Sequence, residues 1–394
     1  MTNSIFSDRI SDVPRSFIRE ILKVAIDPSV ISFAGGLPNR ELFPIKELQE
    51  ATNKVFETEG RDVLQYSNSE GYLSLRQHIS GRYLEKQGLS IPVDNILITN
   101  GSQQGLDLIA KTILNEGDDI IIEEPGYLGA IQAFSVYRAA FNPVPLHDRG
   151  MDVEVLKKVV SIKSPKLMYT VPNFQNPSGV SYIDENRQAV ADIVENTGII
   201  LIEDDPYGEL RFSGSKKSSF KKFLPEQTIL LGSFSKIVVP SFRLGWVAAP
   251  DYIMEKLIIA KQASDLHTNA FVQYITHRYL VDNDIDTHIK KIIAAYGSQC
   301  NAMIQSIRKC FPADVGYTKP EGGMFLWVSL PKAMSSMDLF NLAIKDKVAF
   351  VPGNPFYVDR DQTNTLRLNF SCVDEKTIEI GIGRLGVAIR HLLG

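Results

Sequence analysis

Short apolar segments alternate with amphipathic ones between residues 95 and 250, and this alternation limits the possible fold more than any other feature of the sequence. The strand-like runs are NILIT, DIIIEEP, PKLMYTVP, IILIEDDPY, TILLGSFS and GWVAAP, and helical patterns separate several of them. Strands joined through helices form a mainly parallel sheet that is covered by helices on both faces. We therefore predict an α/β fold whose strands end along one edge, where such sheets bind ligands.

The pattern changes after residue 250. Long helical segments continue to about Phe311, and the runs GGMFLWVSL, VAFVP and TLRLNF then read as strands with helices around them. This predicts a smaller α+β lobe, against which the first forty residues would pack. Because a chain of 394 residues is too long for one simple core, we expect an N-terminal arm, a large domain and a small domain, at 1–45, 46–290 and 291–394.

Composition and charge exclude several classes of protein. The chain is 44% hydrophobic with a net charge of −4, which gives no reason to expect a nucleic acid or an anionic membrane as partner. The 3 cysteines lack metal-ligand spacing and suit a reducing compartment. The amino terminus has no signal-peptide core, and no run is long enough to span a bilayer. We expect a cytoplasmic protein without a metal site.

Polar and aromatic residues follow directly after the predicted strands. Ser102 and Gln103 lie in GSQQG, where a helix would begin, and free amides at a helix start favour an anion such as phosphate. Taken alone, this segment is more simply a helix cap, because it matches neither the dinucleotide fingerprint nor the P-loop. Tyr127, in EPGYLG, could stack on a planar ligand or form a wall of the core.

The later strand ends carry an amide and an acid. Asn176 in FQNPSG is by itself an ordinary turn former. Asp204 and Tyr207 close the strand of IEDDPYGEL, where the acid could start a turn or lie beneath a cationic ring nitrogen. Both interpretations stay open for these residues when each is taken alone.

A lysine stands inside the largely apolar run GSFSKIVVPSFRLGW. Lys236 follows Ser233 and Ser235 there, and Arg243 comes seven positions later. A lysine in such a run is costly to bury unless it is paired or used chemically, although S-x-S-K could also form a surface loop. A second arginine, Arg367, lies far downstream in TLRLNFS.

Pyridoxal 5'-phosphate (PLP) accounts for all of these residues together. It needs a lysine for its Schiff base, an acid that keeps its pyridine nitrogen protonated, and an anion site for its phosphate. Metal, nucleotide or Ser/His/Asp chemistry does not account for the set, and none of the 6 histidines stands beside an obvious nucleophile. The sequence therefore predicts a PLP site.

The chain also resembles the class I, fold type I PLP-dependent aminotransferases, in particular the branch with kynurenine/2-aminoadipate aminotransferases. The segments that carry this resemblance are ISFAGGLPNRELFP, LQYSNSEG, TNGSQQGL, EEPGY, PNFQNPSG, EDDPYGEL, GSFSKIVVPSFRLGW, PEGGMFLWV, VPGNPFYVD and TLRLNFS. The resemblance implies a fold type I transferase, a mainly parallel large-domain sheet and a homodimer with shared active sites. The same domain also occurs behind a DNA-binding domain in some transcription regulators.

The resemblance implies a role for each residue. Lys236 would form the Schiff base, Asp204 would pair with the pyridine nitrogen, and Tyr127 would stack on the ring. Tyr207 and Asn176 would hydrogen-bond the phenolic oxygen of the ring, and the Asn176–Pro177 bond is often cis in this family. The residues expected around the phosphate are Ser102, Gln103, Ser233, Ser235, Arg243 and, from the neighbouring subunit, Tyr66.

Arg367 would bind the substrate α-carboxylate, near Asn176. The segment with Gly36 and Leu37 is expected over the substrate, together with Arg19, which could equally be a solvated helix residue. Leu266 could reach in from the partner subunit. These positions are compatible with aromatic, branched or long acidic side chains.

The function predicted in this way is an aminotransferase. It would exchange an amino group between an L-amino acid (aromatic, branched or 2-aminoadipate-like) and a 2-oxo acid such as 2-oxoglutarate, by a ping-pong route. The alternatives are a PLP-dependent lyase or decarboxylase on the same fold, or a ligand-sensing domain. A carboxylate clamp at Arg367 favours transamination over decarboxylation, and residues 1–30 are too few for a winged-helix domain before ISFAGGLP.

Overall fold

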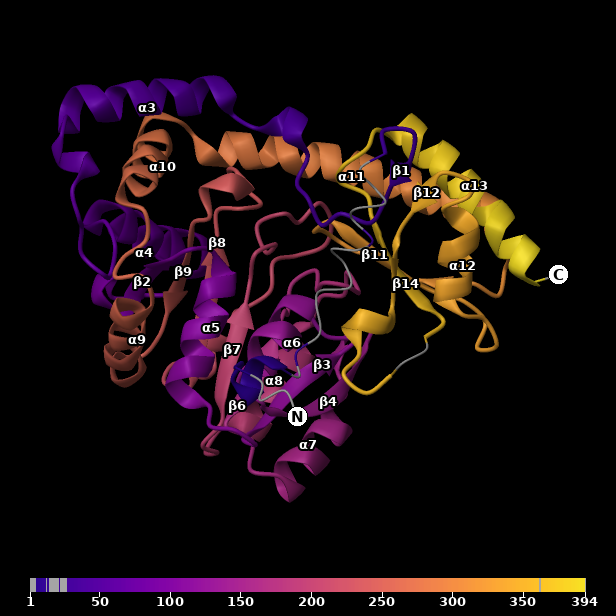
Figure 1. Ribbon diagram of the computed structural model, residues 1–394, viewed down its shortest axis with the longest axis horizontal. Helices are drawn as coiled ribbons and strands as arrows, with labels where there is room; N and C mark the ends of the chain where they lie inside the picture. The colour runs from indigo at the N-terminus through magenta and orange to yellow at the C-terminus, as the bar shows by residue number, and fades with distance from the viewer. Residues whose placement is uncertain (1–4, 12, 14–20, 22–26, 361–362, 394) are drawn as a thin grey trace.

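The computed structural model of the chain forms two lobes that lie side by side (Figure 1). It describes residues 5–11, 13, 21, 27–360 and 363–393. Arg19, expected near the substrate, lies outside the described residues. Among the described residues, no helix has the length and apolar character needed to cross a membrane.

The large lobe is built on an eight-stranded sheet, as the alternating pattern predicted. The strand order is β2 (Ile96–Thr99), β9 (Gly245–Ala248), β8 (Thr228–Ser233), β7 (Ile200–Asp204), β6 (Leu167–Thr170), β3 (Asp119–Glu124), β4 (Ala140–His147) and β5 (Gly150–Met151). The pairs from β8 through to β4 are parallel, whereas β9 runs antiparallel to β8 and β2, and β5 runs antiparallel to β4. The α/β prediction with a mainly parallel sheet is confirmed.

The central strands read as continuous apolar runs because helices cover both faces of the sheet. Every residue of β2, β6 and β8 is buried. The covering helices include α5 (Ser102–Ile113), α6 (Leu128–Ser135), α7 (Val153–Ile162), α8 (Asp184–Val194) and α9 (Asp251–Ser264). Our sequence analysis did not identify β4, because Pro143 and Pro145 interrupt its pattern. The structure accommodates them near the sheet edge, where β4 has only the two-residue β5 on its outer side.

The first part of the large lobe is helical and precedes the sheet. It contains α3 (Ile45–Glu59) and α4 (Leu73–Gln87), and α10 (Ala270–Asp282) packs against both of them. A buried side of α4 faces the sheet through Leu75 and Ile79. These helices therefore close the end of the sheet at which β2 lies (Figure 1).

The small lobe is an antiparallel sheet with helices on one side. Its strands are β10 (Gly316–Tyr317), β11 (Phe325–Ser329), β14 (Thr365–Asn369) and β13 (Val351–Pro352), and its helices are α12 (Ser336–Ala343) and α13 (Glu375–Leu393). The N-terminal segment joins this lobe, since β1 (Ile31–Ser32) pairs with β12 (Val348–Ala349). Within residues 27–40, this pairing places Ile31 and Ser32 on the small lobe.

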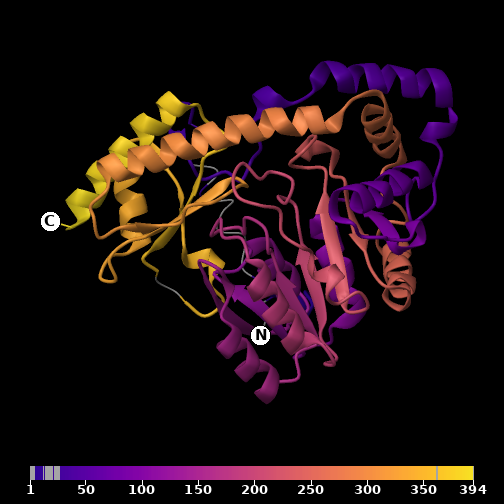
Figure 2. The ribbon, with the colours of Figure 1, turned by 180° about the vertical axis from the view of Figure 1, so that it is seen from behind.

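One long helix, α11 (Ile285–Cys310), belongs to both lobes. It runs without a break from the large lobe to the small one (Figure 2). The domain boundary expected between residues 290 and 291 falls inside this helix, so the chain does not divide at that point. The helical pattern extends past the boundary because Ile289, Ile292 and Tyr296 form one buried stripe along it.

Candidate active site

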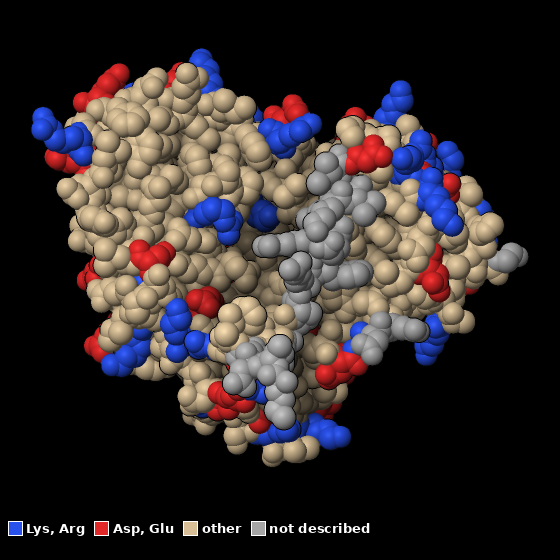
Figure 3. Space-filling view, in the orientation of Figure 1, with Lys and Arg blue, Asp and Glu red and all other residues tan. Residues whose placement is uncertain are grey.

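A cavity of about 400 Å³ lies where strands of the large lobe meet β14 of the small lobe. Figure 3 shows a hollow between the two lobes on this face of the molecule. The predicted residues that line the cavity are Gly36, Leu37, Ser102, Gln103, Tyr127, Asn176, Asp204, Tyr207, Ser233, Ser235, Lys236, Arg243 and Arg367. Because parallel strands end along one edge, residues far apart in the sequence meet there.

Lys236 follows the end of β8 and is partly buried. Its Nζ donates a hydrogen bond to the carbonyl oxygen of Gly36, 3.0 Å away. Burial lowers the pKa of Lys236 to about 8, and the neighbouring charges of Arg367 and Arg243 act in the same direction. A substantial fraction of such an amine is neutral near pH 7, so it is far more available as a nucleophile or a base than an ordinary lysine.

Asp204 ends β7 and is 2% exposed. Its Oδ2 accepts a hydrogen bond from the Tyr169 hydroxyl at 2.7 Å, whereas its buried Oδ1 has no hydrogen-bond partner among the described residues. Burial raises the pKa of Asp204 to about 7, and the nearby carboxyl groups of Asp205 and Glu123 raise it further. A cationic N–H donor against Oδ1 would satisfy this oxygen and restore the charge of the carboxylate, which is what a pyridinium nitrogen offers.

Arg367 extends from β14 of the small lobe into the same cavity. Its Nη1 donates to Asn176 Oδ1 and its Nη2 to the carbonyl oxygen of Ala34, each at 2.8 Å. The guanidinium lies 4.4 Å from the centre of the Phe325 ring, and burial lowers the pKa of Arg367 to about 10. The group therefore stays charged at neutral pH and is fixed in orientation, as the bidentate binding of a carboxylate requires.

The opposite end of the cavity is formed by the start of α5. Gly101, just before Ser102, has φ of +75°, and a Cβ atom there would lie 2.6 Å from Arg243 Nη2. The guanidinium of Arg243 thus lies against the first turn of α5, close to the free N–H groups of the helix. Ser233 and Ser235 are both buried beside this turn, where Ser235 N donates to Ser233 Oγ at 3.1 Å. Amides, hydroxyls and a guanidinium together suit a phosphate.

Comparison with known proteins identifies this arrangement. Residues 29–385 match the family model described as aminotransferase class I and II. The chain belongs to this family. It is 41% identical over 98% of its length to an aromatic-amino-acid aminotransferase 1 of Thermococcus litoralis, covering 94% of that protein, and 38% identical over 97% to a 2-aminoadipate transaminase of Thermus thermophilus, covering 95% of it.

A solved structure is similar along the whole chain. The crystal structure of Pyrococcus horikoshii kynurenine aminotransferase in complex with PMP has a TM-score of 0.94 to this chain, with 40% identity, and covers 99% of this chain and 98% of that one. The protein is therefore a PLP-dependent aminotransferase of fold type I. The unpartnered Asp204 Oδ1, the Lys236 amine and the anion site at α5 fit this cofactor.

Two aromatic residues of the aminotransferase lie on either side of these groups. Tyr127 precedes α6 and is half-buried in the cavity wall, where burial raises its pKa to about 12. Gln103 holds this wall in place, since its Nε2 donates to the carbonyl oxygen of Gly129 at 2.8 Å. Tyr207 is 5% exposed, and its ring meets the edge of Phe325 at 5.8 Å between centroids. Burial raises the pKa of Tyr207, so it is a neutral hydrogen-bond donor here.

The segment that carries Gly36 and Leu37 is held over the site by its backbone. Besides Gly36, the carbonyl oxygen of Leu37 accepts hydrogen bonds, from Ser371 Oγ at 2.8 Å and Cys372 Sγ at 2.9 Å. The Asn176–Pro177 bond on the other side of the cavity is cis. The Leu37 side chain itself is 59% exposed, at the mouth of the cavity.

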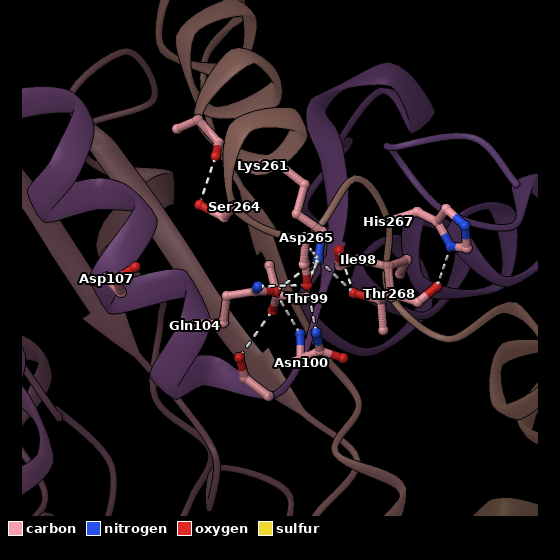
Figure 4. A network of polar contacts seen from close by, with 12 residues as sticks. Ile98, Thr99, Asn100, Gln104, Asp107, Lys261, Ser264, Asp265, His267 and Thr268 are labelled. Carbon is pink, nitrogen blue, oxygen red and sulfur yellow. Dashed lines mark hydrogen bonds and ion pairs between the residues drawn. The ribbon is translucent and has the colours of Figure 1, made fainter. Parts of the chain in front are cut away.

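The aminotransferase holds the turn before α5 through a network that sequence reasoning missed (Figure 4). Lys261 is fully buried, and its Nζ donates to Gln104 Oε1, Asp265 Oδ2 and Thr268 Oγ1 at 2.7, 2.9 and 2.8 Å. Asp265 Oδ2 also accepts from Asn100 Nδ2 at 2.6 Å. The network therefore fixes residues 100–104, which carry the predicted phosphate contacts Ser102 and Gln103. The lysine could not be recognised in the sequence because it stands in an ordinary amphipathic helix.

Two residues expected to act in the neighbouring subunit lie outside the cavity. Tyr66 is 80% exposed, and its ring meets the edge of the His267 ring at 5.8 Å. Leu266, which directly precedes His267 in the chain, is 46% exposed and has φ of +67°. Both side chains thus lie together on one surface, and their role in a partner's active site stays a prediction.

Proposed function

We propose that this aminotransferase exchanges an amino group between an L-amino acid with a large side chain and a 2-oxo acid such as 2-oxoglutarate, in two half-reactions. The relatives named above supply the substrate classes: aromatic amino acids, 2-aminoadipate and kynurenine. A branched side chain is the further candidate. One observation carries the proposal: Lys236, Asp204 and Arg367 converge on one cavity although they come from different elements of two lobes.

Lys236 is the residue that would hold the cofactor aldehyde covalently, as a Schiff base. Bound PLP supplies an electron-withdrawing ring that stabilises negative charge on the substrate Cα. Asp204 would keep the ring nitrogen protonated through Oδ1, and Tyr169 holds the other carboxylate oxygen in place. With the cofactor bound, the Lys236 amine would accept the proton from the substrate Cα, and its lowered pKa suits it to this role.

Arg367 would orient the substrate by its α-carboxylate. Two of its nitrogens are already held by Asn176 and Ala34, whereas Nε has no partner among the described residues. Retention of the carboxylate favours transamination over decarboxylation. Gly36 packs closely beside this group, since a Cβ atom there would lie 3.2 Å from the Phe325 ring and 4.0 Å from Arg367 Nη2.

We also propose that the enzyme works as a homodimer with shared active sites. Tyr66 would reach the phosphate and Leu266 the substrate of the neighbouring subunit, and their exposure on one surface supports this. The large and the small lobe, which share α11, would then move relative to each other.

The visible absorbance of the purified protein tests the proposal. We expect a yellow protein whose band disappears on addition of a donor amino acid and returns with 2-oxoglutarate. A panel of phenylalanine, kynurenine, 2-aminoadipate and leucine would rank the donors. A protein that gains no band with PLP contradicts the cofactor roles assigned to these residues. Release of CO₂ or of an alkene product would indicate the lyase alternative instead, and a band that no amino acid changes would indicate a sensor.

A further inference from the structure

A second cavity, of about 460 Å³, lies behind the segment that carries the active-site lysine. It is bounded by α4, by the amino-terminal half of α11 and by the loop that follows β7. Of the residues given a role above, Ser233 alone lines it as well, and it stands on the boundary with the active site. It is larger than the active-site cavity, and its residues come from one lobe and the helix that joins the two.

The two cavities share a wall. Along the end of β8 and the turn after it, Ser235 and Lys236 line the active site, whereas Phe234 and Ile237 line the second cavity. After β7, Asp204 lines the active site and Asp205 the second cavity. Neighbouring residues of the same segment thus face different cavities, so the wall is one chain thick at these points.

The inner surface of the second cavity is apolar and aromatic. It is formed by Ile79, Tyr83, Phe234, Ile237, Trp246 and Ile289. Trp246 packs on Phe234 with ring centroids 4.9 Å apart, and its Nε1 donates to the Tyr83 hydroxyl oxygen at 2.9 Å. The hydroxyl hydrogen of Tyr83 has no acceptor among the described residues. The floor therefore offers flat ring surfaces and one hydrogen-bond donor.

The carboxylates around this cavity already have partners. Glu203 accepts from Ser219, Asp205 accepts from Asn173 at 3.0 Å, and Glu209 and Asp286 both accept from Arg82. Lys86 also pairs with Asp286. Glu203 also lies near Arg187, so three of these carboxylates pair with cations of the protein. Asp205 has only a neutral partner, but burial raises its pKa and so disfavours its charged form.

Two of the lysines that line the cavity have no partner of opposite charge in the part of the chain that the structure describes. Lys216 and Lys290 have no hydrogen bond and no ion pair with any described residue, and both are exposed at the rim. The other lining cations that are not already named, Arg211 and Lys217, pair with Glu321 and Asp184. The uncompensated charge at the mouth of the cavity is therefore positive.

We propose that the second cavity binds a small aromatic carboxylate. The ring would lie on Trp246 and Phe234, and the carboxylate would face Lys216 and Lys290 at the rim. An apolar pocket with a few convergent polar groups is the usual form of a small-molecule site. The charge selects an anion over a cation or a neutral ring.

Fluorescence of Trp246 tests this binding in the PLP-loaded enzyme. The chain has 2 tryptophans, so Trp327→Phe leaves Trp246 as the single reporter on the cavity floor. The probe is 3-phenylpropanoate, which has neither an amino nor an oxo group and cannot be turned over. We expect saturable quenching, and in the Lys216→Ala/Lys290→Ala variant a dissociation constant at least five-fold weaker. The matched control is Lys158→Ala/Lys332→Ala, two exposed lysines far from the cavity lining, which should bind the probe unchanged.

A further variant separates the two cavities. Arg367→Ala should leave the quenching unchanged, because the probe does not need the active-site arginine. Quenching that is lost in Arg367→Ala would place the probe in the active site and overturn the proposal. Absence of saturable quenching, or an equal dissociation constant in the two double-lysine variants, would overturn it as well.

Discussion

The hydroxyl of Tyr169 donates to Asp204 Oδ2 at 2.7 Å and is the one hydrogen-bond donor to this carboxylate among the described residues. Tyr169 on β6 stands opposite Ile202 on β7 in the parallel register. Because residues two apart on a strand share a face, Asp204 lies on the same face as Ile202 and within reach of the phenol. The bond occupies one carboxylate oxygen, and the other has no hydrogen-bond partner among the described residues.

Tyr169→Phe should lower kcat about ten-fold, with little change in KM for the amino donor. A hydrogen bond to a charged group contributes about 1.5–3 kcal/mol, part of which is lost from the ionised form of Asp204. Donation from Tyr169 lowers the pKa of Asp204, so its removal raises that pKa. The acid limb of the pH profile of kcat should therefore move to higher pH. An unchanged limb would show that Tyr169 only fills space.

The cofactor-free protein should take up PLP at a rate that rises with pH around a midpoint of about 8, the lowered pKa of Lys236. Only the neutral amine is a nucleophile, so uptake slows as the amine becomes protonated below this pH. Stopped-flow absorbance from pH 6 to pH 10 measures the rate. A midpoint near the ordinary lysine value would contradict the burial argument, and Lys236→Ala should show no covalent attachment after borohydride treatment.

Arg367→Ala should lower kcat/KM for every donor amino acid by about a hundred-fold, because the α-carboxylate loses charge-assisted hydrogen bonds of about 1.5–3 kcal/mol. The absorbance band of the bound cofactor should persist, since Lys236 is untouched. Steady-state kinetics with two donors of different side chain provide the measurement. If only one donor is affected, Arg367 contacts a side chain and a different group binds the carboxylate.

Lys261→Met should weaken both folding and cofactor binding. Loss of the buried amine should cost about 1–3 kcal/mol, because Gln104 and Thr268 lose a charge-assisted hydrogen bond and the partly exposed Asp265 loses its ion pair. Urea unfolding of the cofactor-free chain measures the stability, and PLP titration measures the affinity. Lys158→Ala, at an exposed lysine, is the matched control. Normal PLP affinity in a destabilised Lys261→Met protein would show that the network stabilises the fold but does not hold the turn before α5 for PLP binding.

The stability of the cofactor-free chain should fall as the pH rises from about 4.5 to about 7. Burial raises the pKa of Glu123, Glu203 and Asp204 to about 7 in each case. The ordinary values are 4.5 for the two glutamates and 3.8 for the aspartate. The folded state then binds more protons than the unfolded state within this window, so the free energy of unfolding decreases as the pH increases. Each group can contribute at most about 1.4 kcal/mol for each unit by which its pKa is raised. Urea midpoints across the window test this, and Glu123→Gln should reduce the slope. A rising stability would contradict the raised values.

Most strands of the large sheet and the residues that follow them could be predicted from the sequence, because buried parallel strands are continuous apolar runs and their ends carry the polar exceptions. Lys236, Asp204 and Arg243 stand out for this reason, since a charged residue next to an apolar run needs a partner or a use. The α/β class followed from the same alternation. β4 did not, because its prolines are tolerated only by its place near the sheet edge.

Tertiary structure alone decided which groups hold those residues and what lies behind them. Tyr169, Lys261 and the second cavity depend on strand register and helix packing between segments distant in the sequence, so no local pattern marks them. The continuity of α11 across both lobes is of the same kind, because one buried stripe of side chains serves two cores. Local periodicity determines which elements form, whereas the burial of each polar group depends on neighbours that only the folded chain brings together.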